Sequence, residues 1–346
     1  MSTNKAEAKM TIQNSRTMQE RIKGMGNNLS LLIAIVALCI ILGFTNKFFW
    51  TWDNWMTLLL SAAVLIIRAS GATVAMLTGG MDISQNSVGA FSGILIATLA
   101  LNNAEIFPAW LCILLSIGLG FALGSLNAFL IAHIKINPII TTLGTMMIYR
   151  GFAWLINGKT MMIADPTLIA MGRERILTIK DATGDVTFPG IPYSVIIAIA
   201  IFIFIYWLLK YTSYGRKIYM VGGNENASFL SGINASRVKF IAYLFSSVTA
   251  SYAGFLLACQ VGAALPQSGA GTEMLTIAAV VLGGLSLSGG KGSMTGTMLG
   301  ILILTIISNG LDLNQIQSQV QLSVTGAVLI LAVLLDVVRS GSLKKQ

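Results

Sequence analysis

The chain has 346 residues, of which 55% are hydrophobic and 10% are charged, and its mean hydropathy is +0.78. A soluble domain carries about 25% charged residues, so this composition excludes a soluble enzyme, and the abundant apolar surface excludes a disordered chain. The net charge of +9 follows from basic residues that flank apolar segments, so it does not indicate a nucleic-acid partner.

Ten apolar segments are predicted to be membrane helices, because a hydrocarbon core about 30 Å thick needs roughly 20 apolar residues per crossing. Two of them, 86–101 and 273–286, are short and are predicted to be broken or re-entrant. The predicted fold class is therefore an all-α polytopic membrane protein of about ten transmembrane helices, some of them broken or short. The segments are 29–45, 56–77, 86–101, 109–132, 138–157, 192–209, 240–258, 273–286, 294–310 and 320–337.

The distribution of Lys and Arg predicts the topology. Residues 1–28 are too long and polar for a signal peptide, so they are predicted to be a cytoplasmic segment ahead of a retained signal anchor. The transmembrane domain then covers 29–337, with a cytoplasmic loop at 210–239, an outer loop at 158–190 and a cytoplasmic tail at 338–346. In this arrangement the cytoplasmic segments hold 15 Lys and Arg and the outer loops hold five, which is the positive-inside bias.

Two arginines, Arg68 and Arg150, fall inside predicted spans. A charge at membrane depth is a functional candidate by default. Arg150 is near an outer helix end, so its side chain is expected to extend to the membrane surface. Arg68 is closer to the middle of its span and is expected to face a seam within the protein, with contact to a transported solute as the alternative.

Two parts of the chain have similar sequences. Leu77–Ser84 and Leu282–Ser288 each place a glycine pair before a short turn and a serine, and in the predicted topology both copies run in the same direction. This indicates an internal duplication, with chance similarity in a glycine-rich apolar chain as the alternative. A GxxxG step follows each copy and is expected to support close helix packing. The residues of these steps are Gly89, Gly93, Gly296 and Gly300.

The chain lacks the residue patterns of a catalytic, cofactor or metal site. Lys291 follows Gly290, but Leu285 and Gly292 occupy positions where a nucleotide-binding loop needs Gly and Ser or Thr. The single histidine, His133, has no Cys or His cluster around it, and no zinc-hydrolase or membrane serine-protease motif occurs. No carboxylate is identified at membrane depth, which disfavours a proton- or sodium-coupled carrier.

The longest cytoplasmic loop is predicted to contain a two-turn helix. Asn224 can act as its N-cap, Glu225 lies in its first turn and Gly232 can close it. This helix would present Phe229 and Leu230 to a partner surface, or alternatively pack against its own loop. An isolated helix of this length is marginal in water, so docking on a partner is the better explanation.

The loop resembles the cytoplasmic coupling loop of permease subunits in the ribose, galactose, arabinose and xylose group of bacterial ABC importers. That loop reads Gly-Gly-Asn-Pro-Glu-Ala-Ala, two variable residues, then Ser-Gly; this chain departs from it at Glu225, Asn226 and Ser228. It retains Gly222, Gly223, Asn224, Ala227, Ser231 and Gly232.

Three further stretches extend this resemblance over roughly residues 30–340. The first, 80–84, is similar to the family pattern Gly-x-Asp-Leu-Ser, with Gln85 and Asn86 in place of the usual Val-Gly. The second, 137–151, looks like the Pro-Phe-Ile-x-Thr-Leu-Gly segment, and the third, 277–292, is close to the family pattern almost throughout.

The resemblance implies a transport subunit in the bacterial inner membrane, with no enzymatic activity or cofactor of its own. It implies that two permease copies form the pathway, that a separate ATPase subunit uses ATP, and that an extracytoplasmic binding protein delivers a sugar. A stand-alone secondary carrier and a membrane enzyme are the alternative functions. The residues expected to contact the ATPase are Gly222, Gly223, Asn224, Glu225, Ala227, Phe229, Leu230, Ser231 and Gly232.

Three polar residues near the Pro138 segment are candidates for the wall of the translocation path. A sugar needs hydrogen-bond partners along its route, and Asn127, Thr141 and Thr142 supply them within predicted spans. The alternative role of these side chains is hydrogen bonding between helices or to the backbone. The sequence does not indicate which sugar is carried, or whether the two permeases are identical.

Overall fold

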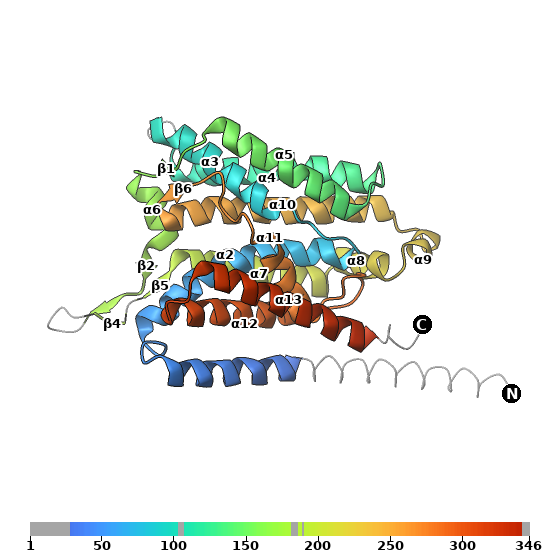
Figure 1. Ribbon diagram of the computed structural model, residues 1–346. Helices are drawn as coiled ribbons and strands as arrows, with labels where there is room; N and C mark the ends of the chain where they lie inside the picture. Colours follow the sequence, from blue (N-terminus) through green and yellow to red (C-terminus); the bar gives the residue numbers. More distant parts are fainter. Residues whose placement is uncertain (1–27, 103–106, 181–185, 189, 341–346) are drawn as a thin grey trace.

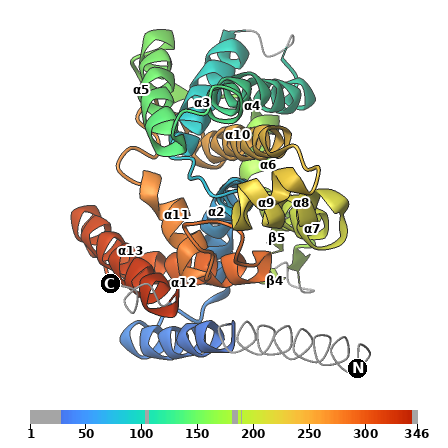
Figure 2. The same ribbon diagram turned by 90° about the vertical axis from the view of Figure 1, so that its right-hand side faces the viewer.

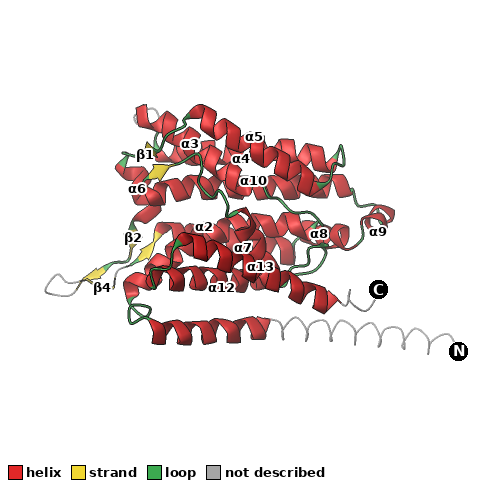
Figure 3. Cartoon of the chain, viewed as in Figure 1, coloured by secondary structure: helices red, strands yellow, loops and turns green. Residues whose placement is uncertain are grey.

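The computed structural model describes residues 28–102, 107–180, 186–188 and 190–340 and shows an α-helical bundle (Figures 1 and 3). All ten predicted segments form helices, and within the described residues seven helices are long and apolar enough to cross a membrane. The fold-class prediction is therefore confirmed. After a first helix, Asn28–Thr45, the helices are α2 Trp52–Leu77, α3 Gln85–Asn102, α4 Ala109–Ala132, α5 Pro138–Ile156, α6 Pro166–Arg173, α7 Tyr193–Tyr211, α8 Ser213–Gly223, α9 Glu225–Leu230, α10 Ala235–Val261, α11 Glu273–Leu282, α12 Met294–Leu313 and α13 Ser318–Ser340.

Short strands cluster at one end of the bundle, which we call the strand end, and α8 and α9 lie at the opposite end, the α9 end (Figure 1). Three antiparallel pairs form, β1 with β6, β2 with β5 and β3 with β4. These strands and α6 replace the plain outer loop predicted from the sequence. The strands are β1 Met161–Met162, β2 Arg175–Ile176, β3 Ile179–Lys180, β4 Val186–Phe188, β5 Ile191–Pro192 and β6 Ala263–Ala264.

The long helices α2 and α10 form the centre of the bundle, and the other helices surround them (Figure 2). In their most apolar stretches 78% of α2 and 72% of α10 is buried, against 22% of α4 and 11% of the first helix. The surrounding helices therefore expose apolar side chains that the described chain does not cover, as expected of surfaces that face lipid or a partner in the membrane.

Two helices, α3 and α11, begin in the middle of the bundle rather than at one of its ends. The first residue of α3, Gln85, donates from Nε2 to Ser246 Oγ at 2.8 Å, and Ser246 is close to the midpoint of α10. Beside it, Asn86 Nδ2 donates to Thr272 Oγ1 at 3.2 Å, just before α11 begins. The two short segments are thus broken helices, as predicted, and the extended stretches before them meet midway along the bundle.

The glycines of both GxxxG steps lie at close helix contacts. A Cβ atom on Gly89 would be 3.0 Å from Ala250 O of α10, and one on Gly300 would be 2.0 Å from Ala279 O of α11. The two similar stretches, 77–84 and 282–288, also touch, because a Cβ atom on Gly79 would be 3.4 Å from Ser288 O. The other two positions, Gly93 and Gly296, meet the backbone of Gly254 and Gly283.

Candidate functional site

The predicted loop helix is present as α9, and its two ends are capped as the sequence indicates. The Asn224 side chain accepts from Ala227 N at 2.9 Å, and Gly232 takes φ +76° directly after the helix, a conformation that favours glycine. Between these caps the side chains of Phe229 and Leu230 are 74% and 86% exposed. Two large apolar groups therefore project from the α9 end of the described chain.

A helix missed by the sequence analysis, α8, holds α9 against the bundle. The hydroxyl groups of Tyr214 and Tyr219 donate to Val238 O at 3.0 Å and to Gly292 O at 3.2 Å. Burial raises the pKa of both tyrosines, so their hydroxyls stay protonated as donors. On the other side of α9, Lys239 Nζ lies 2.6 Å from Glu225 Oε2 and ties α9 to the start of α10.

The remaining loop residues differ in how closely the bundle surrounds them. A Cβ atom on Gly222 would lie 1.8 Å from Leu77 O, so glycine is required for the approach of α8 to α2. At Gly223 a Cβ atom would meet nothing within 4 Å. Ser231 Oγ donates to Ala227 O at 2.9 Å within α9. The predicted loop is thus a structured element: two helices and the start of α10, which begins earlier than the expected span.

A carboxylate lies buried in the middle of the bundle, so the expectation that none is present at this depth is wrong. Asp82 is 3% exposed. Its Oδ1 accepts from Ser84 N at 3.0 Å and Ser84 Oγ at 2.6 Å, and its Oδ2 accepts from Ser246 Oγ at 2.7 Å. The depth of Asp82 could not be predicted because this residue stands in an extended stretch between α2 and α3, where no helical periodicity indicates how deep a side chain lies.

The three candidate path residues occupy two different environments. Asn127 on α4 is fully buried and donates from Nδ2 to Ser84 Oγ at 2.9 Å, so it belongs to the Asp82 network. Thr142 on α5 donates to Pro138 O at 2.8 Å. Thr141 is 6% exposed, and its hydroxyl has no partner among the described residues.

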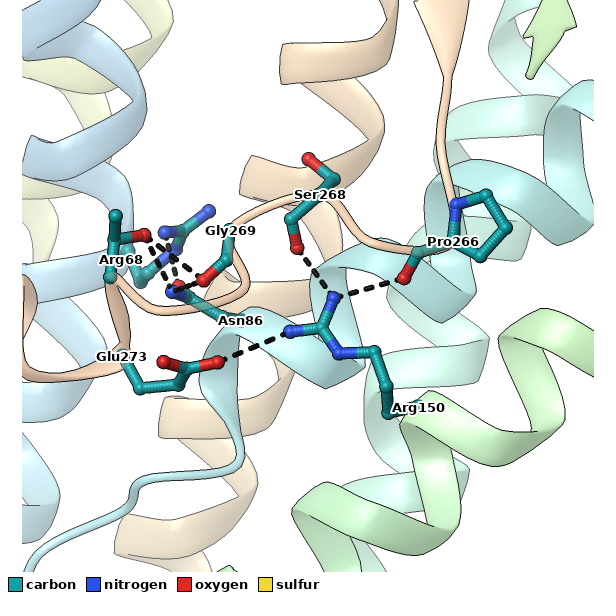
Figure 4. Close-up of polar contacts among 8 residues, drawn as sticks. Arg68, Asn86, Arg150, Pro266, Ser268, Gly269 and Glu273 are labelled. Atoms are coloured by element: carbon teal, nitrogen blue, oxygen red, sulfur yellow. Dashed lines mark hydrogen bonds and ion pairs between the residues drawn. The ribbon is translucent and has the colours of Figure 1, made fainter. Parts of the chain in front are cut away.

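Arg150 on α5 points into the protein, so its expected extension to the membrane surface is wrong (Figure 4). Its Nη1 donates to Ser268 O at 2.6 Å and Pro266 O at 3.0 Å, and its Nη2 lies 3.5 Å from Glu273 Oε1. The side chain is 16% exposed. The extended stretch ahead of α11 leaves backbone carbonyls without helical partners, and they attract the guanidinium.

Arg68 on α2 lies in the seam with α3, as predicted. It is 8% exposed, and its Nη1 donates to Asn86 Oδ1 (Figure 4). Asn86 Nδ2 in turn donates to Gly269 O at 2.7 Å, which joins the beginnings of the two broken helices. Nε of Arg68 is buried without a hydrogen-bond partner among the described residues.

Comparison with known proteins places this geometry in a transport context. Residues 54–333 match the family described as "Branched-chain amino acid transport system / permease component". The ribose import permease of Bacillus subtilis strain 168 is 36% identical over 330 residues, which cover 94% of this chain and 98% of that protein. The D-allose transport system permease of Escherichia coli K12 is 32% identical over 308 residues, 89% of each chain. No solved structure matches the chain.

Proposed function

The chain belongs to the family of branched-chain amino acid transport system permease components, as a permease subunit of a bacterial ABC sugar importer, and we propose that it forms the translocation pathway of an ATP-driven importer. Its cargo in this proposal is a monosaccharide or a related small polar solute that an extracytoplasmic binding protein delivers. A second permease copy or homologue completes the pathway, and a separate subunit hydrolyses ATP.

The observation that carries this proposal is the exposed apolar tip of α9, Phe229 and Leu230. Burial of each side chain in a groove of an ATPase would stabilise the complex by roughly 1.5–3 kcal/mol. Because α9 is tied to α10 by the Glu225–Lys239 ion pair and to α8 directly, ATP-driven movement of the docked helix would be passed to the bundle. A loosely attached helix would absorb this movement.

We place the α9 end in the cytoplasm. The basic residues Lys210, Arg216, Lys217, Arg237 and Lys239 all lie near this end. In Figure 1 the first helix runs from about mid-bundle to the strand end, and α13 ends toward the α9 end, so the described terminal helices have the directions expected for two cytoplasmic termini. Only residue 28 of the predicted N-terminal segment 1–28 and residues 338–340 of the predicted tail 338–346 are among the described residues.

We propose that the pathway lies beside α5, whose first turns carry the candidate residues Thr141 and Thr142. One face of α5 carries exposed apolar side chains, among them Ile140, Met147 and Leu155, at 66%, 72% and 81% exposure. A second permease copy would cover this face and close the pathway between the two α5 helices. Asn127 would contribute through the Asp82 network behind α5.

The coupling role is tested with two variants of α9, Phe229→Asp and Gly232→Pro. Aspartate removes the apolar anchor, and proline cannot take the positive φ at the helix end. We expect both variants to insert normally but to lose co-purification of the ATPase, with sugar-stimulated ATP hydrolysis and uptake falling together. Leu177→Asp likewise puts a carboxylate in place of an exposed apolar side chain, but at the strand end, where Leu177 is 70% exposed, and should leave recovery of the ATPase unchanged.

Unchanged ATPase recovery and unchanged stimulated hydrolysis in both α9 variants would contradict the coupling role. Uptake into membrane vesicles with and without ATP on the cytoplasmic side separates the importer from a stand-alone carrier. The importer requires ATP, whereas a carrier would run on an ion gradient alone.

A further inference from the structure

A cavity of about 570 Å³ runs into the bundle from the strand end. One face of α2 lines it from Thr57 to Arg68, a distance of about 16 Å along the helix axis. Arg173 and Arg175 stand at its strand end and Arg68 at its far end, and none of its lining residues is acidic. The volume is in the range of small-molecule pockets, about 300–1,000 Å³.

The charge of Arg68 is poorly compensated by the described residues. Within them, no carboxylate lies within ion-pair distance of Arg68: Glu273 pairs with Arg150, and Asp82 is hydrogen-bonded to two serines. Asn86 accepts from Nη1 of Arg68, and Nε of Arg68 is buried without a hydrogen-bond partner among the described residues. A buried charge without a counter-charge is costly, so an anion in the cavity would stabilise it.

The charges of the other two arginines that line the cavity, Arg173 and Arg175, are also poorly neutralised. Arg173 donates from Nε and Nη2 to the backbone carbonyls of Gln260 and Val261, and it has no acidic partner within the described residues. Arg175 Nη1 lies 3.6 Å from Asp53 Oδ1, but the carboxylate side chain is 88% exposed, so this pair screens the mouth only weakly. The route to Arg68 is therefore positively charged at both of its ends.

We propose that this cavity is a binding site for a small molecule that carries an oxyanion, a carboxylate or a phosphate group, with Arg68 as the anchor. The planar guanidinium presents paired donors that match two oxygens of such a group. Gln85 and Asn86, which hold Arg68, are the residues that replace Val-Gly of the resembling family pattern. That the molecule is a transported solute rests on the proposed function; its binding does not.

The test is direct binding to the purified full chain in nanodiscs of phosphatidylcholine, without the ATPase. Glucuronate and glucose are the matched probes, since they differ at one carbon, carboxylate against hydroxymethyl, and inorganic phosphate is the second oxyanion. We expect glucuronate or phosphate to bind by calorimetry and glucose to bind at least about tenfold more weakly. Arg68→Gln and Arg173→Gln should each weaken oxyanion binding, whereas Arg237→Gln at the α9 end should not.

Arg68→Lys keeps the charge but loses the paired donors, so it should bind more weakly than the unaltered chain even if Arg68→Gln fails to fold. A repeat in phosphatidylglycerol nanodiscs identifies the source of the group. Stabilisation by this lipid that is lost in the Arg173→Gln and Arg68→Lys variants would support the oxyanion site and assign it to a lipid headgroup. If no oxyanion binds, or all Arg68 and Arg173 variants bind as the unaltered chain does, the proposal is overturned. Since the ATPase is absent, this result is independent of the coupling test.

Discussion

Asp82 and Arg68 are both buried in the middle of the bundle but are compensated differently. The Asp82 carboxylate accepts three hydrogen bonds, from Ser84 N, Ser84 Oγ and Ser246 Oγ, so its charge is spread over fixed dipoles. Arg68 has a single neutral side-chain acceptor, Asn86. We infer that Asp82 fixes the extended stretch against α10, whereas Arg68 keeps binding capacity for a ligand.

The hydroxyl groups of Thr141 and Thr142 form a matched pair for testing the pathway. Replacement of threonine by valine exchanges the hydroxyl for a methyl group and keeps the branched shape. Thr142→Val loses the bond to Pro138 O, so we expect a loss of about 1 kcal/mol in stability. Thr141→Val loses a hydroxyl without a described partner, so stability should be unchanged or higher. If Thr141 contacts the solute, the KM for uptake should rise several-fold.

Thermal unfolding of the purified variants and uptake kinetics in vesicles measure the two effects separately. A Thr141→Val variant with unaltered KM would remove Thr141 from the pathway. A lower melting temperature for Thr141→Val than for Thr142→Val would show instead that the Thr141 hydroxyl has a structural partner.

At the scale of single elements, the sequence predicted what depends on local residues. Asn224 and Gly232 define α9 because a cap needs only its own side chain or backbone conformation. The α8 helix was missed because its sequence ends in two glycines and its apolar stretch, 218–221, is only four residues long. The two-residue strands were missed because their partners are distant in the chain, as for β1 and β6.

The break at α3 could be predicted only in part. The short length of its apolar segment indicated a broken helix, and the structure confirmed it. Its depth depends on Gln85 meeting Ser246, 161 positions later in the chain, and no local pattern encodes that contact. The same limitation explains the error at Arg150, whose backbone partners Pro266 and Ser268 come from the stretch ahead of α11.

A structural unit occurs twice in the bundle in opposite senses. Each copy has a long helix, an extended stretch and a helix that begins midway, first α2 with α3 and later α10 with α11. The first copy leads α3 to the strand end, where it meets β1 and β6, and the second leads α11 toward the α9 end (Figure 1). Both short helices begin at the same depth in the bundle, and Asn86 of α3 donates to Gly269 O and Thr272 Oγ1 ahead of α11. A movement of either copy would therefore be passed to the other through Asn86.

The contact between α8 and α2 predicts a sharp difference between two adjacent glycines. Alanine at Gly222 would place a Cβ atom 1.8 Å from Leu77 O, so α8 must move away from α2. We expect a loss of about 1–3 kcal/mol in stability and weaker ATP-coupled uptake. Alanine at Gly223 meets nothing within 4 Å and should be neutral or slightly stabilising.

Melting temperature and ATP-coupled uptake, measured side by side for Gly222→Ala and Gly223→Ala, test this contact. Equal behaviour of the two variants would mean that α8 is not held against α2 in the working transporter. The comparison is well controlled because both positions belong to the same helix and change by the same methyl group.

At the scale of the whole molecule, the two ends of the bundle determine from which side each partner subunit would approach. The exposed tip of α9 lies at one end of the bundle, toward which α13 also runs, and the paired strands occupy the other end (Figure 1). An ATPase on the α9 end and a binding protein on the strand end would therefore approach from opposite sides of the membrane. The cavity that ends at Arg68 has two of its arginines, Arg173 and Arg175, at the strand end.

This orientation predicts which exposed positions a membrane-impermeant thiol reagent can reach in intact cells. Leu177 at the strand end is 70% exposed, and Arg216 on α8 is exposed at the α9 end. In a background with Cys39 replaced by alanine, we expect Leu177→Cys to react from outside. Arg216→Cys should react only after the cells are opened, because the positive-inside bias leads us to expect α8 in the cytoplasm. Asp181, in the same outer segment as Leu177, lies outside the described residues. The reverse labelling pattern would invert the topology and place the α9 end outside, where no ATPase could dock.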